Sequence, residues 1–112
     1  MFIKGSKVKL YTLGNVFIKE TNNIPVDFTG IAESFDGRKI WYADRLWHRL
    51  DGPAIENSNE TKQWWINGKL HRINGPAIEG AGGSKFWHIH GKSVTELQHK
   101  LLCDLMKLKG LL

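Results

Sequence analysis

The sequence contains little cysteine: Cys103 is the single one among 112 residues. One cysteine cannot form a disulfide within the chain, and a metal site built from several thiolates is excluded. A reducing, cytoplasmic compartment is therefore expected. The apolar runs are much shorter than the roughly 20 residues that cross a bilayer, so no membrane-spanning helix is predicted. The first ten residues, MFIKGSKVKL, contain no apolar stretch typical of a secretion signal.

Catalytic motifs are absent as well. The sequence has no glycine-rich phosphate loop, no nucleophile elbow, no HExxH-type metal motif and no pair of acids at functional spacing. We therefore expect a protein that is not an enzyme. The net charge is +5, but the lysines and arginines form no dense block. That charge serves solubility, or it attracts an anionic partner such as a nucleotide, a nucleic acid or an acidic protein.

What the chain does contain is an internal repeat. The stretches HRLDGPAIE at 48–56 and HRINGPAIE at 71–79 share seven of nine residues and begin 23 residues apart. Three other residue types keep the same period: Glu33, Glu56 and Glu79; Lys39, Lys62 and Lys85; Trp41, Trp64 and Trp87. The repeats cover roughly residues 30–92, with a degenerate first copy, and indicate a repeat architecture.

Turn dipeptides recur with the same period and predict β-hairpins. One set is Asp36-Gly37, Asn59-Glu60 and Gly82-Gly83, and the other is Asp44-Arg45, Asn67-Gly68 and His90-Gly91. Such pairs are typical of two-residue hairpin turns, and the aromatic segments KIWYA, KQWWI and KFWHI between them are typical of strands. We expect two strands per repeat, with HRxxGPAIE as one long connecting segment kinked at Gly-Pro.

These turns also predict a register. Ile55 and His71 should both lie opposite Trp64, which places His48 and His71 beside the tryptophan row as packing residues. Alternation would then turn Arg49 and Arg72 to the opposite face of the sheet, beside Tyr42, Trp65 and His88.

The two ends of the chain differ from the repeats. We expect a single domain over residues 1–112: an N-terminal hairpin cap (1–29), the repeats (30–92) and a C-terminal helix (93–110). A helical apolar stripe runs through Val94, Leu97, Leu101, Leu105 and Leu108, with Ser93 and Glu96 as a capping box and Gly110 as the stop. The predicted fold is therefore mainly β, an antiparallel meander of stacked hairpin repeats with one C-terminal α-helix. The helix should cover the apolar face of the sheet or its last edge. Any part left exposed, or an open sheet edge, would be a surface for a partner or a homo-oligomer.

The repeat unit resembles MORN-type repeats (membrane occupation and recognition nexus). The matching residues are 64–72 (WWINGKLHR) and 75–79 (GPAIE), preceded by 48–56. The likeness is closest to the divergent variety found in small accessory proteins of bacteria and tailed phages, and it covers a little over half of the chain. It implies stacked hairpins that act as a platform for partners without catalysis. A phage-type protein that binds and modulates or inhibits a host defence or nucleic-acid enzyme is the leading functional expectation.

A second hypothesis rests on one predicted sheet face. Arginines beside aromatic rings can hold phosphates and stack bases, so the chain could bind a nucleotide or single-stranded nucleic acid. Alternatively the arginines pair with Glu56 and Glu79, and the aromatic row is simply packed. The candidate binding residues are Arg49, Arg72, Trp65, Tyr42, His88 and Lys62.

A metal site is the weakest of the candidates. His88 and His90 are on one predicted strand, and His99 and Cys103 are on the predicted helix. Ordinary surface histidines explain this pattern better than a zinc site, so no metal and no cofactor are predicted.

Overall fold

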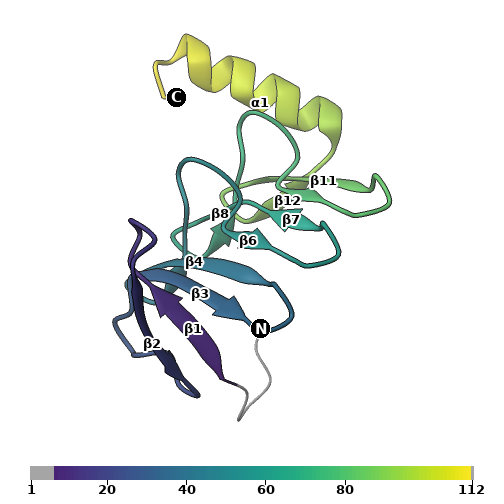
Figure 1. Ribbon diagram of the computed structural model, residues 1–112. Helices are drawn as coiled ribbons and strands as arrows, with labels where there is room; N and C mark the ends of the chain where they lie inside the picture. Colours follow the sequence, from purple (N-terminus) through teal and green to yellow (C-terminus); the bar gives the residue numbers. More distant parts are fainter. Residues whose placement is uncertain (1–6, 112) are drawn as a thin grey trace.

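The structure, a computed structural model, describes residues 7–111 and is mainly β with one C-terminal helix (Figure 1). The predicted fold class is confirmed. The part of the predicted N-terminal cap that falls on residues 1–6 lies outside the described residues. The elements are β1 (Val8–Tyr11), β2 (Phe17–Thr21), β3 (Gly30–Ser34), β4 (Lys39–Ala43), β5 (Leu46–Trp47), β6 (Ile55–Glu56), β7 (Lys62–Gln63), β8 (Trp65–Ile66), β9 (Lys69–Leu70), β10 (Ile78–Glu79), β11 (Lys85–Ile89), β12 (Lys92–Val94) and α1 (Glu96–Leu108).

One long antiparallel sheet contains most of the strands. Its order is β12-β11-β10-β7-β6-β4-β3-β1-β2, with β5 also paired to β4, while β8 and β9 form a separate two-stranded ribbon. The predicted N-terminal hairpin is β1 and β2, and β1 joins it to the first repeat by pairing with β3. The molecule is elongated, with extents of 45 × 31 × 21 Å.

Two strands per repeat are present, and the second is interrupted. Both β5 and β6 pair with β4: Tyr42 lies opposite Trp47, and Ile40 lies opposite Ile55. Residues 49–53 leave the sheet between these two pairings. The HRxxGPAIE segment is therefore a strand with a loop inserted in it, which agrees with the predicted single connecting segment.

The second set of turns has the predicted form. The central residues of each turn have positive φ, as two-residue hairpin turns require. As a result, His71 N–H bonds to Trp64 O (3.0 Å), so His71 lies opposite Trp64 as predicted. In the same way Trp65 lies opposite Leu70, and Trp87 lies opposite Val94.

The prediction of two-residue turns is wrong for the first set, those at residues 36–37, 59–60 and 82–83. Asn57 N–H bonds to Thr61 O (3.0 Å), and Glu60 N–H bonds to Asn57 O (3.0 Å), so the loop contains three residues, not two. Its last residue, Glu60, has φ +72°, and Gly37 and Gly83 occupy the same place in the other two loops. Three-residue loops of this kind combine a type I turn with a bulge residue in the left-handed region.

The extra loop residue shifts the pairing by one position. Ile55 lies opposite Gln63 and Ile40, and not opposite Trp64 as predicted. Because a shift of one residue exchanges the two faces of a strand, Ile40 and Ile55 point away from the tryptophan row.

The hydrophobic core lies on the face opposite the tryptophan row. It contains Val8, Leu10, Phe28, Ala32, Ile40, Tyr42 and Ile55, with Ile24, Trp47 and Trp65 packed against them. The ring contacts Phe28–Tyr42 (5.7 Å) and Trp47–Trp65 (4.8 Å) hold this face together. The core is therefore closed by aromatic side chains of the sheet and its loops, and the helix takes no part in it.

A row of alternating charges crosses the sheet on the tryptophan side. Consecutive register partners along it are Glu20, Lys9, Glu33, Lys39, Glu56, Lys62, Glu79 and Lys85. Opposite charges on neighbouring strands stabilise a sheet by about 0.2–1 kcal/mol a pair, and they disfavour a shifted register. The glutamates and lysines that recur every 23 residues therefore have a structural role, which is to pair neighbouring strands in register.

Helix α1 begins and ends on local signals. The predicted capping box of Ser93 and Glu96 is wrong: the N-cap is Thr95, which exchanges hydrogen bonds with Gln98. Gly110 does end the helix, as predicted. It has φ +67°, and its N–H bonds to Lys107 O while Leu111 N–H bonds to Met106 O. These two bonds are the pattern of a Schellman motif, which favours glycine.

Candidate binding site

The two copies of HRxxGPA form loops that project from the sheet. We call residues 49–53 the first loop and residues 72–76 the second loop. They connect β5 to β6 and β9 to β10, and in Figure 1 they are the two loops that rise toward α1. Loops at the surface of a rigid sheet are the usual place for binding residues.

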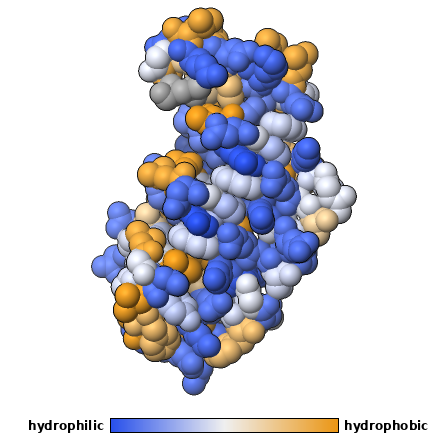
Figure 2. Space-filling model, turned by 45° about the horizontal axis from the view of Figure 1, so that its top comes forward, coloured by the Kyte–Doolittle hydropathy of each residue, from blue (hydrophilic) through white to orange (hydrophobic). Residues whose placement is uncertain are grey.

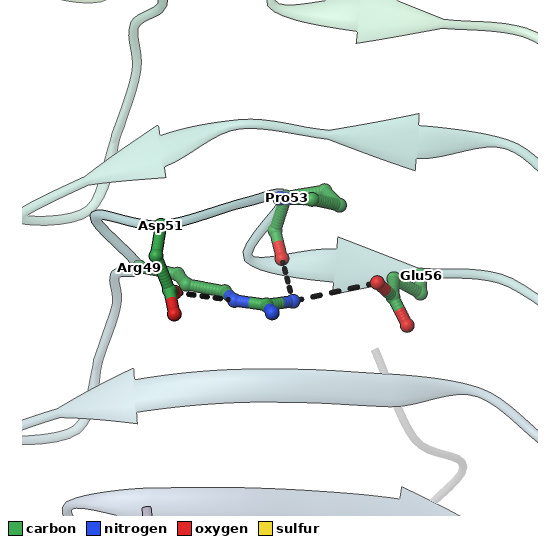
Figure 3. Close-up of polar contacts among 4 residues, drawn as sticks. All are labelled: Arg49, Asp51, Pro53 and Glu56. Atoms are coloured by element: carbon green, nitrogen blue, oxygen red, sulfur yellow. Dashed lines mark hydrogen bonds and ion pairs between the residues drawn. The ribbon is translucent and has the colours of Figure 1, made fainter.

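The guanidinium group of Arg49 holds the first loop together (Figure 3). Its Nε donates to Asp51 Oδ1 (2.9 Å), and its Nη1 donates to Pro53 O (3.2 Å) and reaches Glu56 Oε2 (3.4 Å). The same group lies over the ring of Trp41, 3.9 Å from the ring centre. The hydrogen bond from Arg49, and then its charge, lower the pKa of the Asp51 carboxyl. Charge-assisted hydrogen bonds and a ring contact together make this loop well defined.

Arg72 repeats the arrangement in the second loop. Its Nη1 lies 3.1 Å from both Pro76 O and Glu79 Oε2, and its guanidinium group lies 3.7 Å from the centre of the Trp64 ring. In each loop the glycine before proline leaves room for the arginine. A Cβ at Gly52 or Gly75 would lie 2.9 or 3.0 Å from the central guanidinium carbon. The arginine, glycine and proline that both copies of HRxxGP share thus form the same arrangement in each loop. We call this arrangement the clamp.

Helix α1 takes the place of a third loop. Trp87 is one repeat after Trp64, and His99 of the helix lies over it with ring centres 4.9 Å apart. His99 is 4% exposed, and its Nε2 donates to the carbonyl oxygen of Arg72 at 2.5 Å. The helix therefore lies on the tryptophan side of the sheet and closes the row of loops at its C-terminal end.

A groove of about 630 Å³ separates the two loops. Trp64, Ile66 and His71 line it together with residues 49–52 of the first loop and 72–74 of the second. Leu50 stands at its edge and is 81% exposed. The groove combines an apolar lining with the arginine side chains, which is the composition of a recognition site.

A second cavity of about 380 Å³ separates the second loop from α1. Cys103 lies here, with its Sγ 3.7 Å from Ile73 O and 3.8 Å from His99 Nδ1. Burial, and then the charge of Asp104, raises the pKa of the Cys103 thiol. A raised thiol pKa opposes formation of the thiolate, the form in which a cysteine acts as a nucleophile.

The histidines of HRxxGPA join one repeat to the next. His48 Nδ1 accepts from Asn67 N–H (2.9 Å), and His71 Nδ1 accepts from His90 N–H (2.9 Å). Each histidine thus caps the following hairpin turn, 19 residues later, in the packing role predicted for it. His71 also stacks on the ring of His90, with centres 4.3 Å apart. Burial lowers the pKa of His71, and the charges of His90 and His99 lower it further.

The predicted binding residues do not share one face. Arg49 and Arg72 lie over Trp41 and Trp64, so the prediction that they face away from the tryptophan row is wrong. Tyr42 is buried in the core on the other face, where burial raises the pKa of its hydroxyl. Alternation fails for the arginines because the chain leaves the sheet directly after His48 and His71, which do lie opposite Trp41 and Trp64.

The other three predicted residues are also accounted for. Trp65 packs against the core, and its Nε1 donates to Gln63 Oε1 (2.8 Å). His88 is partly buried, and its Nδ1 has no hydrogen-bond partner among the described residues. Lys62 lies between Glu56 and Glu79 in the charge row. The structure therefore separates Lys62 from the aromatic side chains with which it was grouped.

The histidines and the cysteine considered for a metal are not brought together. Within residues 7–111, no three His, Cys, Asp or Glu side chains are close enough to hold an ion. His90 stacks on His71, whereas His99 and Cys103 face the second loop.

Sequence reasoning missed Leu50 and the groove itself. The signal was present, because the otherwise repeated segment varies at two adjacent positions, Leu50-Asp51 in the first copy and Ile73-Asn74 in the second. Variable residues in a fixed loop frame are typical of recognition positions.

Comparison of the chain with protein-family models, with curated proteins and with solved structures gave no match. Within the described residues, α1 is too short and too polar to pass through a membrane.

Proposed function

We propose that the chain is a non-enzymatic binding module that holds a protein partner in the groove between its two loops. The observation that carries the proposal is Leu50, an 81% exposed leucine on a loop fixed by the Arg49 clamp. A large apolar side chain on a rigid support, beside an apolar groove, gains free energy when a partner covers it. Full burial of a leucine is worth about 1.5–3 kcal/mol. Rigid anchors also lose little entropy on binding.

Charge indicates the chemistry of the partner. The chain carries a net charge of +5. Within the described residues, the Nη2 atoms of Arg49 and Arg72 make no hydrogen bond, although Nη1 of each is engaged. A partner with an apolar side chain for the groove and carboxylates around it would match both features.

The resemblance to MORN-type repeats supports a platform role. On that resemblance we propose an accessory protein of the phage type that acts in the host cytoplasm and modulates or inhibits a host protein. This step depends on analogy and not on the geometry of the site. The alternative, a binder of nucleotides or single-stranded nucleic acid, has less support. Of its aromatic side chains, Tyr42 is buried in the core and Trp65 packs against the core, and Lys62 lies between two glutamates.

A capture experiment with matched variants tests the proposal. Wild-type chain, Leu50→Asp and Val26→Asp are immobilised and exposed to bacterial lysate. Val26 is 78% exposed and lies far from the loops in sequence, so it controls for a new surface charge. A host protein should be retained in equimolar amount by the wild type and by Val26→Asp. Leu50→Asp should retain at least about tenfold less, which corresponds to 1.4 kcal/mol.

Equal retention by all three forms would contradict the groove as the site. Recovery of only nucleotides or nucleic acid, released by salt, would favour the alternative function.

A further inference from the structure

The outer face of α1 carries a row of leucines that the fold does not cover. Leu97, Leu101, Leu105 and Leu108 are 65%, 58%, 47% and 86% exposed. The residues that contact the rest of the molecule, His99 and Cys103, lie on nearly the opposite side of the helix at 3.6 residues per turn. In Figure 2, hydrophobic side chains lie at the end of the molecule that α1 forms, with hydrophilic side chains between them. We call these four residues the leucine row. The expectation that the helix buries its apolar stripe against the sheet is wrong.

We propose that the leucine row pairs with the leucine row of a second copy of this chain, in an antiparallel arrangement. The first argument is the charge at one edge of the row. Lys100 and Asp104 lie along that edge, 70% and 52% exposed, with their charges 2.8 Å apart. The edge therefore offers both a cation and an anion, spaced by one helical turn.

Two-fold symmetry makes this edge complementary to itself. In a two-fold dimer both copies use the same surface, so a contact from one residue of the first copy to another residue of the second also occurs in the reverse direction. In an antiparallel pair of helices, like edges meet. An axis at the level of Leu102 would bring Lys100 of each copy level with Asp104 of the other. The same axis would set the leucines of one copy between those of the other, as packing of ridges into grooves requires.

A parallel pair lacks this match. It would set the Lys100 and Asp104 edge against the other edge of the row, which carries Gln98 and Lys109. Only the antiparallel arrangement gives both Lys100 and Asp104 an opposite charge on the other copy, in addition to the ion pair within each helix.

The size of the surface sets the expected strength. A helix of 13 residues is about 20 Å long, and four leucines cover less than the roughly 800 Å² that each partner buries in a standard interface. The dimer should therefore be weak and depend on concentration. Because the row faces away from the loops, pairing leaves the groove of the proposed binding site open.

Sedimentation velocity of the full chain tests the proposal. The mass should rise from 12.8 kDa toward twice that value as the concentration is raised from micromolar to hundreds of micromolar. Leu101→Asp should remain monomeric throughout, with the helical circular dichroism and melting temperature of the wild type. Leu50→Asp, an exposed leucine elsewhere, should dimerise as the wild type does.

A charge exchange tests the antiparallel register. Lys100→Glu and Asp104→Lys should each weaken the dimer by about tenfold or more when studied alone. An equimolar mixture of the two variants should dimerise at least as well as the wild type, because each copy then complements the other.

A chain that stays monomeric at all concentrations overturns the proposal, even if another protein binds the leucine row. So does a dimer that survives Leu101→Asp, for example one that forms through the open edge of β2 and is lost in Ile18→Lys. Failure of the mixed variants to restore pairing also overturns it.

Discussion

Replacing Arg72 by methionine should unfold the second loop and destabilise the whole array. Methionine keeps the apolar length over Trp64 but removes the charge and the donors. The charge-assisted bond to Pro76 O contributes about 1.5–3 kcal/mol. The contact with the ring adds about 0.5–2 kcal/mol. The ion pair with Glu79, whose side chain is 40% exposed, adds only about 0.2–1 kcal/mol. These contributions share one side chain and do not add fully, so we expect a loss of about 2–3 kcal/mol.

Chemical and thermal unfolding measure this loss. For a chain of this size, about 2–3 kcal/mol should lower the melting temperature by about 8–15 °C. Hydrogen exchange of the amides in residues 73–76 should accelerate in the variant before global unfolding does. Lys19→Met, on the edge strand β2 and remote from the loops, serves as the control and should leave the melting temperature unchanged.

Arg72→Met would refute the clamp if it behaved like Lys19→Met or lost less than about 0.5 kcal/mol, the usual range of surface substitutions. A large loss without faster exchange in residues 73–76 would also refute it, because the effect would then arise outside the loop.

Two further predictions concern the clamp and the junction between repeats. Gly75→Ala should lower the free energy of unfolding in urea by about 1–3 kcal/mol, because its Cβ would lie 3.0 Å from the Arg72 guanidinium carbon. The matched control is Gly82→Ala, whose Cβ would meet no atom within 4 Å. Equal losses in the two variants would contradict the role of Gly75 in the clamp. Acid should weaken the His71 junction: burial, helped by His90 and His99, holds the folded pKa of His71 below 6.5, so the unfolded chain binds the proton more readily. The stability that neutral His71 provides is therefore complete above about pH 6.5 and is lost as the pH falls through the folded pKa. The urea midpoints measured at pH 5 and at pH 7.5 should therefore differ less in His71→Gln than in the wild type. An identical pH dependence in the two proteins would count against this role.

The repeat could be predicted from the sequence, and the register could be predicted only in part. Asn67-Gly68 specifies a two-residue turn, since both residues must adopt positive φ. Asn59-Glu60 does not specify its loop length, and the choice of two residues there was wrong. The charges contained the missing information. A three-residue loop sets Glu56 opposite Lys62, whereas the two-residue loop sets it opposite Gln63. Pairing of opposite charges would have selected the longer loop and set Ile55 opposite Gln63. It would not have placed the arginines, because strand alternation does not apply to residues 49–53, which leave the sheet.

The position of the helix could not be predicted from its pattern. A leucine stripe indicates that one face is apolar, but it does not say what covers that face. The core was already closed by Phe28, Trp47 and Trp65, residues far from the helix in sequence. What attaches the helix to the second loop is a pair of residues outside the stripe, His99 and Cys103, which contact the backbone carbonyls of Arg72 and Ile73.

The histidine junction has a consequence for how such a chain can grow. Each repeat presents the same acceptor, the histidine Nδ1, to the turn of the next repeat, and the next repeat presents the same backbone N–H in return. A duplicated unit of 23 residues brings its own tryptophan, arginine, glycine and histidine, so every bond across the new boundary is conserved. An insertion of any other length breaks the match between donor and acceptor. Lengthening by gene duplication is therefore open to this architecture in whole units only, and the helix would stay at the end of the longer array, over the last tryptophan.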